Sequence, residues 1–273
     1  MCKVLQISRS TYYYEMNRQT GGGKVHSDSE LSNEIVRIFN SNRKCYGTRR
    51  IKNELSKQGL TASRRRIGRI MKMKNLVSSY TILSYKAYPT KVNNRKVTNG
   101  LDRDFNRKIP MEVLVSDLTY VKVTGKWHYI CLFIDLFNRE IVGHSAGPRK
   151  DSQLVSSALS SIQHDLRDVQ MFHTDRGKEF DNQLIDEVLD TFGIRRSLSM
   201  KGCPYDSAVA ETTFKAMKTE FIRQYDFNSL QQLNIELFDY INWYNNIRSH
   251  GALDYQAPKE YKEFFYKNCS IIC

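Results

Sequence analysis

The sequence lacks any long apolar run, so it offers no candidate for a membrane span. No stretch of its 273 residues approaches the roughly 18 apolar residues that a transmembrane helix needs, and no signal peptide opens the chain. We therefore expect a cytoplasmic protein with no membrane partner.

Several common catalytic and metal-binding patterns are also missing. The six cysteines form no Cys-x-x-Cys pair, and they do not combine with the histidines into a zinc-site spacing. No nucleophilic Ser-His-Asp arrangement and no phosphate-binding Gly-rich loop appears, because residues 21–23 form an isolated Gly triplet without the remainder of that motif. The cysteines are best interpreted as reduced thiols.

What is present includes enough apolar residues for a core and a strongly uneven charge. The chain is 40% apolar and shows no internal repeat, which suits one large domain or a medium domain with a small companion. Its net charge of +13 divides into +17 over residues 1–110 and −4 over residues 111–273. A basic front half on a mildly acidic body indicates a polyanion-binding arm joined to a second functional region.

The basic half contains three predicted short helices. The first opens at the capping-box spacing of Ser27 and Glu30, the second begins near Thr48, and the third begins near Ser63. A short turn between the last two predicts a helix-turn-helix-like unit. The third helix has cations and no acid, which favours DNA contact over a merely solvated face. The candidate contacts are Arg64, Arg65, Arg66 and Arg69.

The sequence pattern of residues 111–273 predicts strands and helices in alternation. Expected strands cover residues 113–123, 127–137, 140–144, 169–173 and 195–199, and expected helices cover about 151–166 and 181–192. A further helix follows a loop at 200–204. This order predicts an α/β fold, a mixed sheet with helices on both faces.

Three acids stand out against this pattern. Asp117 lies in the first strand, and Asp175 follows the short strand that ends at His173. Glu211 lies on the later helix, with 35 residues between it and Asp175. Strand ends in α/β sheets gather functional groups, and a helix can lie across them. Three carboxylates brought together in this way can hold a pair of hard divalent cations, which is the machinery for phosphodiester chemistry.

The helix that carries Glu211 has two distinct stripes. Ala210, Phe214 and Met217 recur at helical spacing and should face the core, while Lys215 and Lys218 share the stripe of Glu211. Lys218 lies two turns beyond Glu211 and is well placed to bind a DNA phosphate.

Other residues of the same types favour structural roles. We interpret Asp135 as a structural acid, Asp206 as a helix cap and His173 as a residue that packs beneath the acidic loop. Near the end of the chain, aromatics at helical spacing in residues 233–249 indicate core packing, and Arg248 and His250 are candidates for DNA contact.

Taken together, these motifs resemble the OrfB protein of the insertion-sequence-three family of transposases, within the retroviral-integrase-like DDE superfamily. The similarity covers nearly the whole chain, with two small departures: Leu114 stands where the family usually has Trp, and Ser207 where it usually has Asn. The matching segments are CYGTRRI (45–51), RIMK (69–72), SDLTYV (116–121), IDLFNREIVG (134–143), HTDRG (173–177), GCPYDS (202–207) with Glu211 and Lys218, and YNNIRSH (244–250).

The resemblance implies a ribonuclease H-like core, preceded by a small all-α helix-turn-helix-like domain. It implies that Asp117, Asp175 and Glu211 bind Mg²⁺ or Mn²⁺, as two ions, and catalyse cleavage and strand transfer of an element's DNA ends. Implied partners are double-stranded DNA of the element ends and target, further copies of the chain on that DNA, and an upstream OrfA product joined by frameshifting. The host implied is bacterial, with the protein at the nucleoid.

On this basis we expect an N-terminal tail over residues 1–24 and a DNA-binding domain over 25–76. A basic linker over 77–110 and a catalytic core over 111–266 follow. Two other functions stay open at this point. A DNA-binding regulator could retain the fold without transposing, and a simple metal-dependent nuclease could use the same acids.

Overall fold

The computed structural model describes residues 28–81, 100–101, 105–199 and 208–269, together with residues 8 and 12. The chain divides into two compact units, Met1–Val77 and Ser78–Cys273. Several predictions lie outside the described residues: the cap at Ser27, the loop at 200–204, the cap at Asp206, and most of the proposed tail and linker.

The first unit contains the three predicted helices, α2 (Asp28–Ser41), α3 (Thr48–Lys57) and α4 (Arg64–Met73). Ser63 caps α4, since its side chain accepts a hydrogen bond from the backbone N–H of Arg66. The apolar residues predicted to face inward are all buried, which confirms the amphipathic interpretation of each helix. They are Leu31, Ile35, Ile38, Phe39, Ile51, Leu55, Ile67, Ile70 and Met71.

The second unit is built on a five-stranded mixed sheet. Strands β1 (Val113–Val123), β2 (Lys126–Asp135) and β3 (Ile141–Gly147) pair in an antiparallel manner, with Gly125 at φ +80° in the turn between the first two. Strands β4 (Met171–Thr174) and β5 (Arg195–Leu198) add in parallel beside β1.

The resulting strand order is β3-β2-β1-β4-β5, which places β1 at the centre of the sheet. A long hairpin followed by parallel strands that return through helices gives the mixed sheet that the sequence predicts. The α/β, ribonuclease H-like class is therefore confirmed.

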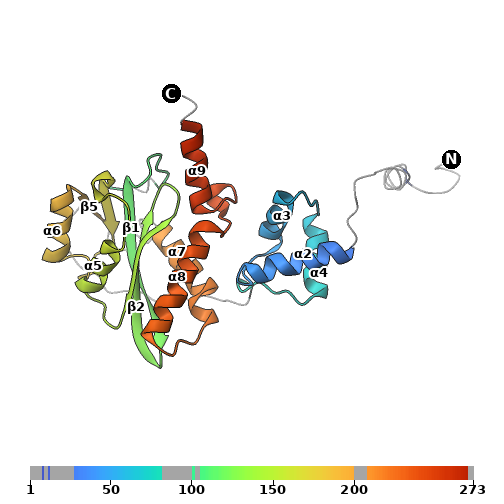
Figure 1. Ribbon diagram of the computed structural model, residues 1–273, viewed down its shortest axis with the longest axis horizontal. Helices are drawn as coiled ribbons and strands as arrows, with labels where there is room; N and C mark the ends of the chain where they lie inside the picture. Colours follow the sequence, from blue (N-terminus) through green and yellow to red (C-terminus); the bar gives the residue numbers. More distant parts are fainter. Residues whose placement is uncertain are drawn as a thin grey trace. The chain divides into compact units, whose positions relative to one another are not determined.

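One face of the sheet is covered by α5 (Ser152–Ser160) and α6 (Gln183–Phe192), as Figure 1 shows. Side chains from both helices and from three strands form one core cluster, which includes Leu114, Phe133 and Phe172. Leu114, at the position where the resembling family usually has Trp, is buried in this cluster.

The opposite face is covered by α7 (Ala208–Glu220) and α8 (Leu230–Asn246), and α9 (Pro258–Cys269) packs against α8 (Figure 1). The aromatic stretch of α8 is core, as predicted, with Tyr240, Trp243 and Tyr244 buried. Helix α9 was not predicted, although Tyr261 and Phe265, which are four residues apart, contact Phe137.

Some element ends differ from the sequence prediction. Helix α5 ends at Ser160, not near residue 166, because its end approaches β3 closely. The Ser161 hydroxyl accepts a hydrogen bond from the His144 N–H at 2.8 Å, and a Cβ at Gly143 would lie 2.7 Å from the Ala158 carbonyl oxygen. None of the described helices is long and apolar enough to cross a membrane.

Candidate active site

Two of the predicted acids meet at the free edge of β1, just beyond its pairing with β4. The parallel register joins Val115 to His173, so two further residues along each strand place Asp117 opposite Asp175. Neighbouring strands lie about 4.8 Å apart, which brings the two carboxylates into direct electrostatic range. Strand pairing thus brings together residues that lie far apart in the sequence.

This pair carries excess negative charge in a poorly solvated place. Burial raises the pKa of Asp117 to about 7, and the charge of Asp175 adds to the rise. The N–H of Leu118 donates a hydrogen bond to Asp117 Oδ1 at 2.7 Å and opposes this rise in pKa. Burial also raises the pKa of Asp175, and the charge of Glu179 acts in the same direction.

The turn after β4 is held tightly around Asp175. The Gly177 N–H donates to Asp175 Oδ1 at 2.9 Å. The carboxylate of Glu179 occupies the space that a Cβ at Gly177 would need, so any other residue there would displace that carboxylate. Sequence reasoning did not select Glu179, although its position four residues after Asp175 in the same turn was a usable signal.

A lysine from the loop before α5 partly balances these acids. Lys150 Nζ lies 2.8 Å from Glu179 Oε1. Burial alone would lower the pKa of Lys150, but its hydrogen bond to Glu179 and the charges of Asp175 and Asp117 raise it overall. Lys150 is a second residue that sequence reasoning missed, because no spacing rule connects it to the acids.

The third predicted acid, Glu211, lies in the first turn of α7 and is exposed. It lines the same cavity as Asp117, and the two predicted lysines of the Glu211 stripe line that cavity as well. The wall includes Asp117, Leu118, Glu211, Phe214, Lys215, Lys218, Thr219, Arg223 and Tyr80.

Lys218 is half-buried at this cavity, while Lys215 is exposed. Lys218 Nζ lies 5.0 Å from the centre of the Tyr120 ring. Burial lowers the pKa of Lys218 and the charge of Arg223 acts in the same direction, while Asp117 opposes the shift. The cavity therefore has Asp117 on the strand side, and Glu211 together with the two lysines on the side of α7.

The described residues contain no group of three His, Cys, Asp or Glu side chains close enough to form a finished metal site. Asp117 lies beside Asp175 through the pairing of the strands, and it lines the same cavity as Glu211. The three carboxylates are nevertheless not close enough together to form one metal-binding group. Glu211 stands at the start of its helix, directly after residues 200–207, which lie outside the described part of the chain.

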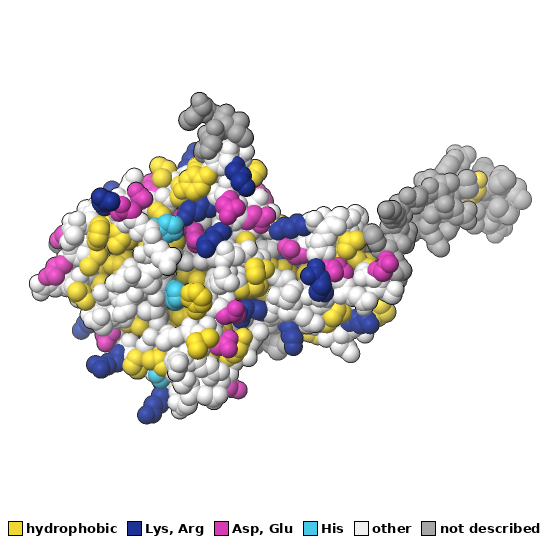
Figure 2. Space-filling model, in the orientation of Figure 1, with side chains coloured by type: hydrophobic (Ala, Val, Ile, Leu, Met, Phe, Trp, Pro, Cys, Tyr) yellow, Lys and Arg dark blue, Asp and Glu magenta, His cyan; other side chains and the backbone are white. Residues whose placement is uncertain are grey.

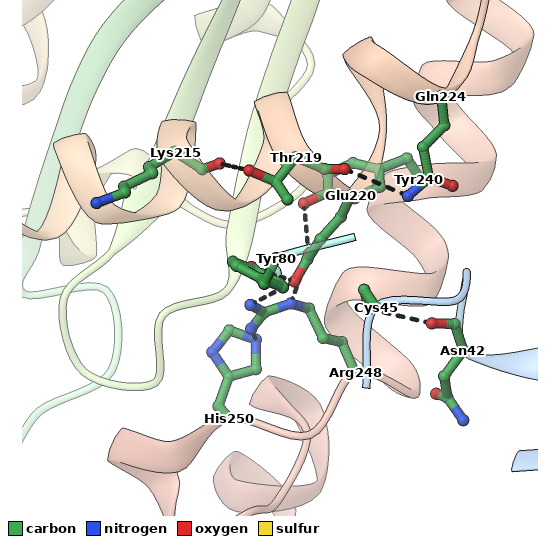
Figure 3. Close-up of polar contacts among 10 residues, drawn as sticks. All are labelled: Asn42, Cys45, Tyr80, Lys215, Thr219, Glu220, Gln224, Tyr240, Arg248 and His250. Atoms are coloured by element: carbon green, nitrogen blue, oxygen red, sulfur yellow. Dashed lines mark hydrogen bonds and ion pairs between the residues drawn. The ribbon is translucent and has the colours of Figure 1, made fainter. Parts of the chain in front are cut away.

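Behind the cavity, α7 carries a different acid into the core (Figure 3). Glu220 is 0% exposed and receives two bonds from Arg248, at 2.7 Å from Nε and 2.8 Å from Nη2. The hydroxyls of Tyr80 and Tyr240 also donate to Glu220, at 2.6 and 3.2 Å. Fully bonded, this buried ion pair ties the end of α7 to the end of α8.

This placement corrects the expectation that Arg248 and His250 contact DNA. Both are buried, and Arg248 Nη1 lies 3.0 Å from His250 Nε2. A DNA phosphate could reach the guanidinium only after its bonds to Glu220 were broken. The Tyr-Asn-Asn-Ile-Arg-Ser-His motif therefore has a structural role in this unit. The motif itself contains no acid, so its sequence alone could not indicate that Arg248 pairs with a buried carboxylate.

Two other residues have the structural roles predicted for them. Asp135 is fully buried and accepts hydrogen bonds from the backbone N–H groups of Met111 and Phe137. His173 is buried on β4, and its Nδ1 lies 2.8 Å from Ser197 Oγ on β5. Asp117 and Glu211 line the cavity, whereas Asp135 and His173 do not.

In the first unit, Arg64, Arg65 and Arg69 are exposed on α4, and Arg66 is partly exposed. The face of the molecule in Figure 2 shows basic and acidic side chains interspersed over both units rather than a single large patch of one sign.

Models of known protein families match most of the chain. Two family models described as integrase core domain match residues 107–204 and 211–264, and one described as HTH-like domain matches residues 26–81. Among solved structures, the HTLV-2 integrase catalytic core domain is similar at a TM-score of 0.44 and 17% identity, over 56% of this chain and 96% of that one.

Two named relatives match over nearly their full length. The transposase for insertion sequence element IS904 of Lactococcus lactis is 30% identical, over 86% of this chain and 94% of that protein. The chain belongs to the insertion-sequence transposases. The transposase InsF for IS3A of Escherichia coli is 29% identical over 96% of this chain and 92% of that protein.

A Shigella flexneri relative named for the element IS1353 is 31% identical over 94% of this chain, which spans only 50% of that longer protein. The motifs, the mixed sheet and these relatives agree on the insertion-sequence-three type. As a transposase of the integrase type, the chain is a polynucleotidyl transferase that acts in DNA cleavage and strand transfer.

Proposed function

We propose that Asp117, Asp175 and Glu211 are the catalytic acids of this transposase and that together they bind two divalent cations. The observation that carries this proposal is the position of Asp117. Its carboxylate lies beside Asp175 through the strand register and shares a cavity with Glu211. No other acid among the described residues links the sheet edge to α7 in this way.

The donor set suits Mg²⁺ or Mn²⁺. Hard cations of this kind prefer carboxylate oxygens, with water and substrate phosphate completing the coordination. The negative charge of the Asp117–Asp175 pair is only partly balanced by Lys150 and Lys218, and a divalent cation would balance the rest. When bound, a pair of such ions activates the attacking oxygen and neutralises the phosphate being transferred.

The other cavity residues serve to hold DNA. Lys218 and Arg223 place positive charge beside the acids, where a backbone phosphate next to the scissile bond would lie, and Lys215 adds a more exposed cation. Leu118 and Phe214 form an apolar part of the wall and limit the access of water. The acids thus handle the reacting phosphate while the cations fix its neighbours.

The first unit acts as a DNA-binding module in this proposal. The exposed arginines of α4 contact phosphates of double-stranded DNA at the element ends, and residues 25–76 form the module. Residues 77–110 connect it to the catalytic core at 111–266. The match to an HTH-like family model over residues 26–81 supports this division.

We further propose that the active form is an oligomer on DNA and that it includes an upstream OrfA product as a frameshift fusion. The relative from Shigella flexneri, twice the length of the match, supports the existence of a longer form. In such a fusion the additional segment would supply recognition of the terminal repeats.

The test is a reaction on element-end DNA with the chain alone and with the chain fused to the upstream product. We expect nicked ends and strands joined to target DNA in the presence of Mg²⁺ or Mn²⁺, and neither product with EDTA. Cleavage without joining would identify a nuclease, and binding without cleavage would identify a regulator; either result would overturn the proposal.

A further inference from the structure

The far end of the β1–β2 hairpin exposes two large aromatic side chains. Strand β4 pairs with β1 only from Val113 to Val115, so the rest of that edge of β1 extends beyond the parallel part of the sheet. On this extension Tyr120 is 55% exposed, and Trp127 on the neighbouring strand β2 is 51% exposed. Burial in the core therefore does not explain why two aromatic rings stand here.

These rings form an ordered row with a cation at each end. The Tyr120 and Trp127 rings lie 5.0 Å apart at 89°, in an edge-to-face contact. Lys122 Nζ lies 5.0 Å from the Trp127 ring centre, and Lys218 Nζ lies 5.0 Å from the Tyr120 ring centre. The order along the surface is Lys218, Tyr120, Trp127 and Lys122, and we call this row the hairpin platform.

The hairpin platform continues from the catalytic cavity. Lys218 lines the cavity that contains Asp117 and also touches the first ring of the row. From residue 118 to residue 129 the hairpin contains two lysines and a histidine but no acid. A negatively charged chain leaving the cavity along this surface would meet positive charge at both ends of the row.

Two adjacent exposed aromatic rings with a cation at each end match one class of ligand particularly well. Every nucleobase has a π-face that stacks on an aromatic side chain, while lysines bind the phosphates between bases. A protein partner would have to desolvate the two lysines without supplying phosphates, which makes a second copy of the chain a poorer fit.

We propose that Tyr120 and Trp127 stack with unpaired bases of the DNA strand that leaves the catalytic cavity, while Lys122 and Lys218 bind its phosphates. This rests on the proposed function, since the cavity must hold a DNA end for a strand to leave it. The platform positions the substrate strand and takes no part in the chemistry. Its ligand is single-stranded DNA of any sequence.

The chain has a built-in probe for this contact. It contains two tryptophans, of which Trp127 is 51% exposed and Trp243 is 5% exposed. We expect single-stranded oligothymidine to quench the fluorescence of Trp127 in the full-length protein. An abasic oligomer of the same length, with the same phosphates but no bases, should leave it nearly unchanged.

Three variants separate stacking from structure. Trp127→Ala should weaken oligothymidine binding by about five- to 150-fold, the range for one stacked base. Trp127→Phe should retain most of the affinity but lose the quenching, since only Trp243 then fluoresces. Phe238→Ala removes a ring that is 66% exposed on α8 and should change neither quantity.

Unchanged Trp127 fluorescence at saturating oligothymidine, or equal quenching by the abasic oligomer, would overturn the platform. A loss of self-association in Trp127→Ala, seen by sedimentation without a loss of DNA affinity, would assign the surface to a second copy and also overturn it.

The Asp117→Asn variant separates this inference from the proposed function. It should show full oligothymidine quenching without strand transfer. If wild-type protein transfers strands but shows no quenching, only the platform fails. If wild-type protein is quenched but transfers nothing, only the proposed function fails.

Discussion

Two acidic groups of the catalytic unit, both near α7, differ in how their charge is balanced. Glu220 is buried against Arg248 and two tyrosine hydroxyls, so its charge and its hydrogen bonds are satisfied within the protein. Asp117 lies beside Asp175, with no comparably bonded cation, and its pKa is raised to about 7 by burial and by that neighbour.

The difference separates a structural group from one that we propose to be functional. A satisfied ion pair holds two helices together and has no capacity left for a ligand. Acids held together against their own repulsion are destabilised until a cation arrives, which is the arrangement expected of a site that binds metal and substrate. Substitutions at the two groups should therefore have opposite consequences.

The largest effect is expected from the acids of the cavity. Asp117→Asn, Asp175→Asn and Glu211→Gln should each lower strand transfer at least about a thousandfold, because groups that act as a unit each cost nearly as much as the whole. DNA affinity should change little. The measurement is joined product from element-end DNA beside a binding isotherm; appreciable joining by one variant would remove that residue from the catalytic set.

The second effect concerns stability at the Glu220–Arg248 pair. Arg248→Met should lower the free energy of unfolding of the catalytic unit by about 3–5 kcal/mol, since it leaves a carboxylate buried without its partner. Urea titrations followed by circular dichroism measure this.

A double variant with Glu220→Leu and Arg248→Met should recover most of that loss, because apolar replacement of both partners removes the unpaired charge. If the double variant is as unstable as the sum of the two single variants, the account of this pair is wrong.

A third effect, opposite to the loss expected at Arg248, is a gain of stability on removing the charge of Asp117. Its pKa of about 7 lies above the ordinary aspartate value of about 3.9, so folding disfavours the ionised carboxylate. Without metal, the free energy of unfolding should fall as pH rises between these two values and stay lower above them. At pH 8, Asp117→Asn should therefore raise the melting temperature of the metal-free protein.

Added Mg²⁺ should separate the stabilities of wild-type protein and Asp117→Asn further. At a hundred times its dissociation constant it should stabilise wild-type protein by about 2.7 kcal/mol, or several degrees, and stabilise Asp117→Asn much less. Equal Mg²⁺ stabilisation of both proteins would show that the ion binds elsewhere.

The smallest effect per residue is expected in the first unit. Replacing Arg64, Arg65, Arg66 and Arg69 with Ala should weaken DNA binding across sequences and flatten its salt dependence by about 0.9 in slope for each phosphate that is no longer bound. Arg37→Ala is a matched control, because Arg37 is an exposed arginine on α2 that pairs with Glu34. An unchanged slope in the fourfold variant would exclude these arginines.

The sequence predicted most of the fold because its patterns are local. Helical periodicity located the three helices of the first unit, and alternating apolar residues located β1 with both of its ends. The ends of α5 and β3 were misplaced because they depend on the close approach at Gly143, a tertiary contact without a sequence signature. Helix α9 was not predicted, although Tyr261 and Phe265 stand at helical spacing.

The candidate site was predictable in part for the same reason. Asp117 and Asp175 follow from their places on adjacent strands. Lys150 and Glu179 appear only once the turn after β4 is folded against the loop before α5. The prediction for Arg248 was wrong because an arginine near aromatic residues has the same local sequence pattern whether it contacts DNA or a buried carboxylate. Only the position of Glu220 in the folded chain distinguishes the two.

The central claim is that the three acids hold two cations, and a Mn²⁺ titration of the DNA-bound full-length protein tests it most directly. Electron paramagnetic resonance measures free Mn²⁺, with Asp165→Asn as a control at an exposed acid. The account predicts two bound ions per catalytic site in the wild type and control, and fewer in Asp117→Asn, Asp175→Asn and Glu211→Gln. Two tightly bound ions in any of these three variants would contradict it.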